Sequence, residues 1–143
     1  MSAQKSVAVI GSGPAGLMAA TRLALSSAAD IHIYEKRSGM GRKLLIAGCS
    51  GLNISHSLPA SEFSEHYRGW TPKRWTKLLS QFGPAEWIQF IESELKLETF
   101  LGTSDRYFVR EMKASGLLKA WCTLLESSGV KFHPSHEWTD FSE

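Results

Sequence analysis

Cysteine is scarce in this sequence, and neither a block of like charge nor a long apolar run is present. The 143 residues include only two cysteines, Cys49 and Cys122, which stand far apart in no recognised spacing. A disulfide framework or a zinc site is therefore not expected, and a reducing compartment suits the chain. Sixteen Lys and Arg against fourteen Asp and Glu leave a net charge of +2. That charge is too small to indicate binding of nucleic acid.

The apolar segments are short and interrupted. Arg22 and Asp30 break the longest of them before it reaches the ~20 residues that a membrane-spanning helix needs. The apolar residues after Lys5 have some features of a signal peptide, but Gly11 and Gly13 break that core and no convincing cleavage site follows. We therefore expect a cytoplasmic protein with no membrane partner and no nucleic-acid partner.

The first part of the chain predicts a βαβ unit. Residues 6–10, SVAVI, are short, apolar and β-branched, as in a strand that is buried on both faces. A glycine turn leads into an Ala- and Leu-rich helix from Pro14, where proline suits the first helical turn. The alternating residues 31–35, IHIYE, predict a second strand, and a helical crossover is what parallel strands require.

Helices, a hairpin and a third strand are predicted downstream. The expected elements are helices at 72–82 and from Pro84, extended pieces at 97–102 and 106–109, a helix at 113–128 and a strand at 130–134. We expect residues 1–143 to form the N-terminal part of one α/β, Rossmann-like domain with a parallel sheet, incomplete at its C-terminus. Within it we distinguish a cofactor loop (36–57), a helical and hairpin insertion (61–112), and the last helix with the third strand (113–134).

The turn GSGPAG at residues 11–16 matches the pattern G-x-G-x-x-G. Gly11 would turn the chain sharply, Gly13 would let a pyrophosphate approach the backbone, and Gly16 would let helix and strand pack closely. Glu35 lies 19 residues after Gly16, at the end of the second strand, where a carboxylate accepts hydrogen bonds from a ribose diol. A plain glycine-rich turn with a surface glutamate is the alternative, but the strand and helix around the motif favour a dinucleotide site.

The segment 36–57 has no helical or strand period long enough to predict a packing element. Its adjacent cations, Arg42 and Lys43, lie only a few residues beyond Glu35, and small residues such as Gly48 follow them. A loop of this length is either functional or disordered. The residues alone leave two interpretations open, a mobile surface loop or a cradle whose cations neutralise a pyrophosphate.

Two motifs resemble those of a known family. VAVIGSGPAGLMAA with Glu35 resembles the N-terminus of flavoproteins that have two dinucleotide-binding folds. GRKLLIAGCSGLN is similar to a narrower pattern of BaiN-like (aminoacetone oxidase-like) bacterial flavoproteins, in which Gly-Arg-Lys and an apolar run precede Gly-x-Gly-Arg-Cys-Asn. The matching positions are Gly41, Arg42, Lys43, Gly48 and Asn53, whereas Ser50, Gly51 and Leu52 replace Gly, Arg and Cys. In DRYFVREMKA, Arg106, Phe108, Lys113 and Ala114 fit a second family pattern, while Asp105 and Val109 depart from it.

The resemblance implies that the chain is the FAD-binding first third of such a flavoprotein. FAD would place its ADP half on the glycine turn and Glu35, with Trp138 near the adenine, and NAD(P)H would reduce it for an unknown small-molecule acceptor. The expected cofactor-binding residues are Gly11, Ser12, Gly13, Pro14, Ala15, Gly16, Glu35, Lys36, Arg42, Lys43, Gly48, Asn53 and Trp138. The expected macromolecular partner is a missing C-terminal part or a second copy of the chain.

Two other functions fit the same motif, a truncated and non-catalytic nucleotide-binding remnant, and the NAD-binding Rossmann domain of a dehydrogenase. No catalytic residue is assigned, because no histidine or carboxylate stands in a recognisable arrangement. A metal site at His133 and His136 is disfavoured, since no helix aligns them and no third ligand is near. A redox role for Cys49 is disfavoured because it has no resolving cysteine. His56 is either a flavin-facing or a solvated residue.

Overall fold

The structure is a computed structural model, and it describes residues 5–26, 29–48 and 52–141. The chain forms two compact units. Unit 1 comprises residues 1–49 and 114–143, and unit 2 comprises residues 50–113. None of the described helices is long and apolar enough to cross a bilayer.

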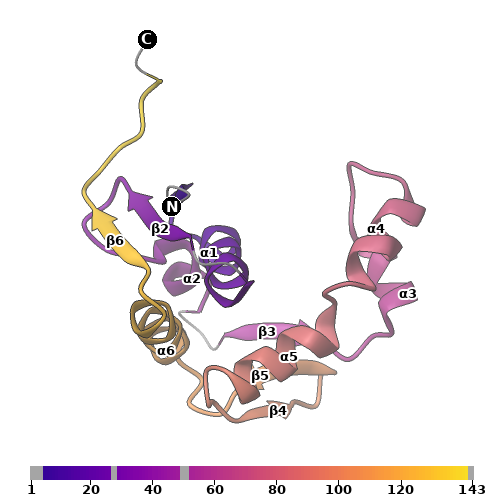
Figure 1. The fold of residues 1–143 in the computed structure, drawn as a ribbon. Helices are drawn as coiled ribbons and strands as arrows, with labels where there is room; N and C mark the ends of the chain where they lie inside the picture. The colour runs from indigo at the N-terminus through magenta and orange to yellow at the C-terminus, as the bar shows by residue number, and fades with distance from the viewer. Residues whose placement is uncertain (1–4, 27–28, 49–51, 142–143) are drawn as a thin grey trace. The chain divides into compact units, whose positions relative to one another are not determined.

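Unit 1 is built on a parallel sheet of three strands in the order β1-β2-β6, and Figure 1 shows β2 beside β6. Its elements are β1 (Ser6–Ile10), α1 (Pro14–Ser26), β2 (Asp30–Glu35), α2 (Arg42–Ala47), α6 (Ala114–Ser127) and β6 (Lys131–Pro134). The register pairs Ser6 with Asp30 and Ile10 with Tyr34, and all three strands run the same way. These elements confirm the predicted Rossmann-like fold class with its βαβ unit and third parallel strand.

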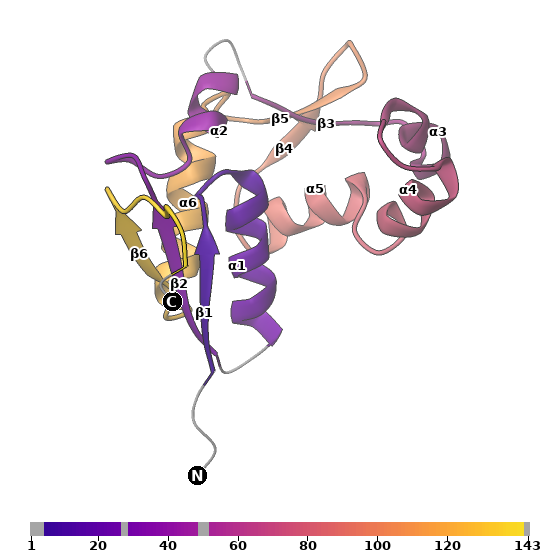
Figure 2. The ribbon, with the colours of Figure 1, turned by 90° about the horizontal axis from the view of Figure 1, so that it is seen from above.

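One face of this sheet is covered by α1 and α6, which also contact each other (Figure 2). The core between them contains Leu17 and Ala20 of α1, Ile31 and Ile33 of β2, and Leu117, Trp121 and Leu125 of α6, all at most 3% exposed. The indole N–H of Trp121 donates to Oγ1 of Thr21 at 2.8 Å, which satisfies two polar groups inside this core. The helical period of apolar residues thus positions α6, as the sequence predicts.

The expectation that the first strand is buried on both faces was wrong. Along β1 the residues alternate between exposed and half-buried, and Ile10 is 54% exposed. Two reasons account for this: β1 ends the strand order, and the sheet face that carries Ala8, His32 and Tyr34 stays partly open in the described part of the chain. Burial of a strand depends on elements far away in sequence, which a run of five apolar residues cannot report.

Unit 2 is an antiparallel sheet in the order β3-β5-β4 with short helices. Its elements are β3 (Asn53–His56), α3 (Ala60–Phe63), the 3₁₀ turn η1 (Ser64–His66), α4 (Pro72–Leu79), α5 (Pro84–Ser93), β4 (Thr99–Leu101) and β5 (Arg106–Val109). Phe90, Ile91, Leu95 and Val109 are buried in its core. The indole N–H of Trp87 donates to the carbonyl of Ile54 at 2.9 Å and ties α5 to β3.

The segment 36–57 is not a continuous loop, contrary to the prediction. It contains the helix α2 and the strand β3, and it passes from unit 1 into unit 2. α2 spans only six residues, too few to show a helical period, and β3 is a strand because β5 lies beside it. The insertion predicted at 61–112 lies within unit 2. Unit 2 begins before residue 61 because it also includes β3, which pairs with β5.

Candidate functional site

The glycine turn between β1 and α1 has the geometry that its motif predicts. Gly11 adopts a left-handed φ of 94°, and its N–H donates to the carbonyl of Tyr34 at 2.8 Å. A Cβ on Gly16 would lie 1.9 Å from the carbonyl oxygen of Gly11. Only glycine therefore lets α1 begin this close to the end of β1.

Gly13 has open space where a side chain would stand. An ideal Cβ there meets no heavy atom within 4 Å, and the residue lines a pocket of about 540 Å³. Pro14 and Ala15 follow at the exposed start of α1, where the first N–H groups of a helix lack acceptors within the helix. The turn offers room and hydrogen-bond donors to an anionic group, as a pyrophosphate requires.

Glu35 stands at the end of β2, on the rim of the same pocket. Its Oε2 accepts hydrogen bonds from Oγ of Ser12 at 2.6 Å and from the Ser12 N–H at 3.0 Å, and its Oε1 accepts one from the N–H of Arg37 at 3.0 Å. The Ser12 hydroxyl is the largest cause that lowers the pKa of Glu35, and the two N–H groups and the Arg37 charge act in the same direction. The carboxylate is thus ionised at neutral pH and available as an acceptor.

The pocket has an excess of positive charge. Its charged side chains are the cations Lys36, Arg37, Arg42 and Lys43 and the carboxylates Glu35 and Glu137. Lys36 forms an exposed ion pair with Glu137 at 3.5 Å, whereas Arg42 and Lys43 form no ion pair with any described residue. This balance favours an anionic ligand.

The remaining wall comes from the segment that follows β6. The N–H of Ser135 donates to the carbonyl of Arg37 and that of His136 to the carbonyl of Glu35, both at 2.9 Å. These bonds hold residues 136–138 beside the pocket, where Trp138 is 49% exposed. The pocket therefore lies at the carboxyl ends of the parallel strands, where open α/β sheets bind their ligands.

Glycines fix both ends of α2. Gly41 has φ 64° and ψ 22°, and a Cβ there would lie 2.3 Å from Cδ1 of Leu118 on α6. A Cβ on Gly48 would lie 2.3 Å from the Cβ of Ala114. The two glycines let α2 lie close against α6. In this position the first turn of α2 places Arg42 and Lys43 at the pocket.

Most, but not all, of the expected cofactor residues gather at this pocket. The pocket is lined by Gly11, Gly13, Glu35, Lys36, Arg42, Lys43 and Trp138. Ser12, Pro14, Ala15 and Gly16 do not line it, Gly48 packs on α6 instead, and Asn53 belongs to unit 2, where it pairs with Phe108. The expectations that concern Cys49, Ser50 and Gly51 fall outside the described residues.

Sequence reasoning did not name several residues of the pocket. Tyr34 and Arg37 lie within two residues of Glu35, so the motif could have predicted them. A ligand that binds a residue at the end of a strand also contacts the neighbours of that residue in sequence. His136 and Glu137 lie just after β6, about a hundred residues later, and only the sheet topology brings them here.

The two histidines of the H-x-x-H sequence pattern, at which no metal site was expected, have other partners. Nε2 of His133 lies 2.8 Å from Nδ1 of His32, and the ring stacks on Tyr34 at a centroid distance of 4.6 Å. Nδ1 of His136 lies 2.8 Å from the carbonyl oxygen of Pro134. No group of three potential metal ligands occurs in the described part of the chain. Cys122 is half-buried on α6, and burial raises the pKa of its thiol.

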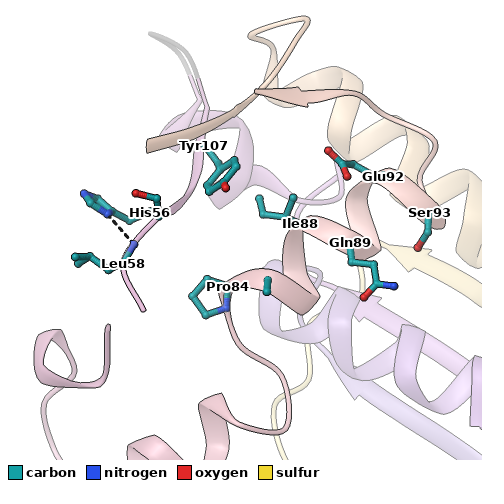
Figure 3. Close-up of a pocket in the computed structure, with 10 residues that line it drawn as sticks. His56, Leu58, Pro84, Ile88, Gln89, Glu92, Ser93 and Tyr107 are labelled. Carbon is teal, nitrogen blue, oxygen red and sulfur yellow. Dashed lines mark hydrogen bonds between the residues drawn. The ribbon is translucent and has the colours of Figure 1, made fainter. Parts of the chain in front are cut away.

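A second pocket, of about 570 Å³, lies within unit 2 (Figure 3). One side is the face of α5 with Pro84, Ile88, Gln89, Glu92 and Ser93, and the other sides carry His56, Leu58 and Tyr107. The N–H of Leu58 donates to Nδ1 of His56 at 3.3 Å, so a neutral His56 has its proton on Nε2. No glycine lines this pocket, and its lining residues include one carboxylate, Glu92, and one imidazole, His56.

Among three similar solved structures, the one with a TM-score above 0.5 supports the fold. The crystal structure of Thermovibrio ammonificans THI4 matches with a TM-score of 0.52 and 16% identity, over 92% of this chain and 38% of that one. The Diels-Alderase PyrE3 matches with a TM-score of 0.46 and 16% identity, over 98% and 27%. An oxidoreductase from Methanosarcina mazei matches with 0.47 and 13%, over 91% and 51%. The chain thus spans about half or less of the length of these structures.

A search of curated proteins found no match. The family described as "HI0933-like protein Rossmann domain", in contrast, matches residues 5–143, nearly the whole chain. Its Rossmann domain agrees with the parallel sheet, the glycine turn and the pocket at the strand ends, and the match confirms the family resemblance of the two motifs. The chain belongs to the HI0933-like protein family and contains that family's dinucleotide-binding Rossmann domain.

Proposed function

We propose that unit 1 binds FAD and serves as the cofactor domain of an oxidoreductase that uses NAD(P)H as electron donor and a small molecule as acceptor. The observation that carries this proposal is the pocket in which an open Gly13, an ionised Glu35 and the cations of α2 face one space. Its residues suit the ADP half of a dinucleotide, with the ribose on Glu35 and the pyrophosphate on the glycine turn.

The residues of this chain would bind and orient the cofactor. Glu35 would accept hydrogen bonds from the ribose hydroxyls, and the start of α1 with Arg42 and Lys43 would offset the charge of the pyrophosphate. FAD, when bound, supplies the redox chemistry itself. A 2′-phosphate on the ribose would meet the Glu35 carboxylate, so this pocket should prefer an adenosine without it.

The choice of FAD over NAD rests on the family, since both dinucleotides share the ADP half and the motif that binds it. The cations at the start of α2 agree with an extended ligand that continues past the pyrophosphate. An NAD-binding domain of a dehydrogenase and a remnant without ligand are the competing functions.

Absorption spectroscopy of the purified chain tests the proposal. We expect bound FAD, or saturable uptake of added FAD at equal stoichiometry, detected by the flavin absorption bands after gel filtration. Uptake of NAD alone would favour the dehydrogenase domain. A colourless chain whose melting temperature responds to neither FAD nor NAD nor ADP would contradict dinucleotide binding altogether.

A further inference from the structure

Ser12 is a fully buried polar residue at the centre of a hydrogen-bond bridge. Its side chain is 0% exposed, and its Oγ lies 2.6 Å from Oε2 of Glu35 and 3.0 Å from the backbone nitrogen of Gly41. A backbone N–H can only donate and an ionised carboxylate can only accept. The Ser12 hydroxyl therefore donates to Glu35 and accepts from Gly41, so its orientation is determined.

The Gly41 end of the bridge sets the start of α2. Gly41 is buried and left-handed, and its carbonyl accepts the first bonds of the helix from the N–H groups of Leu44 at 2.9 Å and Leu45 at 3.2 Å. The next two residues, Arg42 and Lys43, are two of the four Lys and Arg residues that line the pocket. A change in the position of Gly41 would therefore move both cations.

The Glu35 end of the bridge determines which carboxylate oxygen can accept a hydrogen bond from a ligand in the pocket. The carboxylate accepts two bonds from Ser12 on Oε2 and one from the Arg37 N–H on Oε1. An ionised carboxylate has about four acceptor positions, so about one remains on Oε1 for a ligand. Ser12 thus decides which oxygen of Glu35 faces a ribose.

We propose that Ser12 is a positioning residue whose hydroxyl couples the ribose-binding carboxylate to the cationic start of α2, so that the two ends of an ADP group are recognised cooperatively. This inference rests on the proposed function for the identity of the ligand, but the coupling itself is a property of the free chain. Preorganised groups bind more tightly because the ligand does not have to order them.

The ligand-free test measures hydrogen exchange at the Gly41 amide by NMR. In the wild-type chain we expect a protected amide, and we expect Glu35→Gln to accelerate its exchange about tenfold through the weakened bridge. In a Ser12→Ala background the amide should exchange fast, and Glu35→Gln should add nothing. Equal Gly41 exchange rates in the wild type and Ser12→Ala would overturn the proposal.

The ligand-bound test uses calorimetric titration with ADP. Ser12→Ala should weaken ADP binding about fivefold or more. In the wild-type background, the loss of ADP affinity in the double variant Glu35→Gln with Arg42→Ala should differ from the sum of the two single losses. In the Ser12→Ala background, it should equal that sum. The matched control is Thr21→Val, because Thr21 is also a buried hydroxyl that bridges two elements, at 2.8 Å from both Leu17 O and Trp121 Nε1. It should lower stability and leave ADP affinity unchanged.

These two tests separate the failure of each idea. A wild-type chain that shows the Gly41 coupling but binds no ADP would overturn the proposed function and keep the bridge. Additive losses in both backgrounds, or an ADP affinity that Thr21→Val lowers as much as Ser12→Ala, would reduce Ser12 to a structural residue and overturn the coupling.

Discussion

The two units each contain a pocket of similar volume, about 540 Å³ in unit 1 and 570 Å³ in unit 2, yet their walls differ in kind. The unit 1 pocket lies at the ends of parallel strands and exposes backbone at Gly11 and Gly13. The unit 2 pocket lies along one face of α5 and exposes side chains, among them His56 and Tyr107 (Figure 3). The volumes therefore do not distinguish the two pockets, whereas access to backbone N–H groups and the pattern of charges do.

The largest expected effect comes from Gly16→Val. Its Cβ would lie 1.9 Å from a backbone carbonyl that side-chain rotation cannot move, so unit 1 should lose about 3 kcal/mol of stability, the upper end of overpacking costs. Chemical denaturation measures this loss. The matched control is Gly13→Ala, whose Cβ has open space: it should fold normally and still bind FAD poorly. Equal stability of both variants would refute the assigned roles of the two glycines.

Glu35→Gln should give the next largest effect. Loss of a charged acceptor for the ribose hydroxyls should weaken ADP and FAD binding by about 1.5–3 kcal/mol. Isothermal titration measures the change, with Glu62→Gln on the exposed surface of unit 2 as the charge-matched control. An affinity that drops equally in both variants would indicate a general charge effect and not a ribose contact.

The contribution of the Glu35 carboxylate should also be visible in the pH dependence of the free energy of unfolding. Ser12 and the neighbouring N–H groups lower the folded-state pKa of Glu35 from its ordinary value of 4.5. Its contribution to stability should therefore be complete above that value and be lost as the pH falls through the lowered folded-state pKa. Denaturation of the wild type and Glu35→Gln between pH 7 and pH 3 measures the difference, which should shrink only at the acidic end.

Removal of the α2 cations should give the smallest effect. Arg42→Ala and Lys43→Ala should each weaken FAD binding by about 0.5–1 kcal/mol, because both side chains are exposed and solvent screens them. Titrations at low and high salt should show the loss shrinking as salt rises. Lys73→Ala and Lys77→Ala on α4 are the controls, and an equal loss in these variants would place the ligand outside the unit 1 pocket.

The sequence predicts the parts of unit 1 that depend on neighbouring residues. The apolar strand, the glycine turn, the helix and the terminal Glu35 are all local, and the structure places them together as expected. The period of Leu117, Trp121 and Leu125 likewise predicts α6 and its buried face.

The missed features depend on partners distant in sequence. β3 is a strand only beside β5, α2 is too short for a detectable period, and β1 is half-exposed because of its place in the sheet. The approach of His136 and Glu137 to the pocket requires β6 to run parallel to β2. The bridge through Ser12 is the clearest case, since no pattern connects a turn residue with the start of a helix 29 positions later.

Amide chemical-shift mapping tests the central claim most directly. The uniformly ¹⁵N-labelled chain is titrated with FAD, and the two units are compared in one spectrum. The account predicts saturable shifts at the amides of Gly11, Gly13 and Arg37, with the amides of His56 and Tyr107 unchanged. Shifts confined to unit 2, or no saturable shift at the glycine turn, would contradict it.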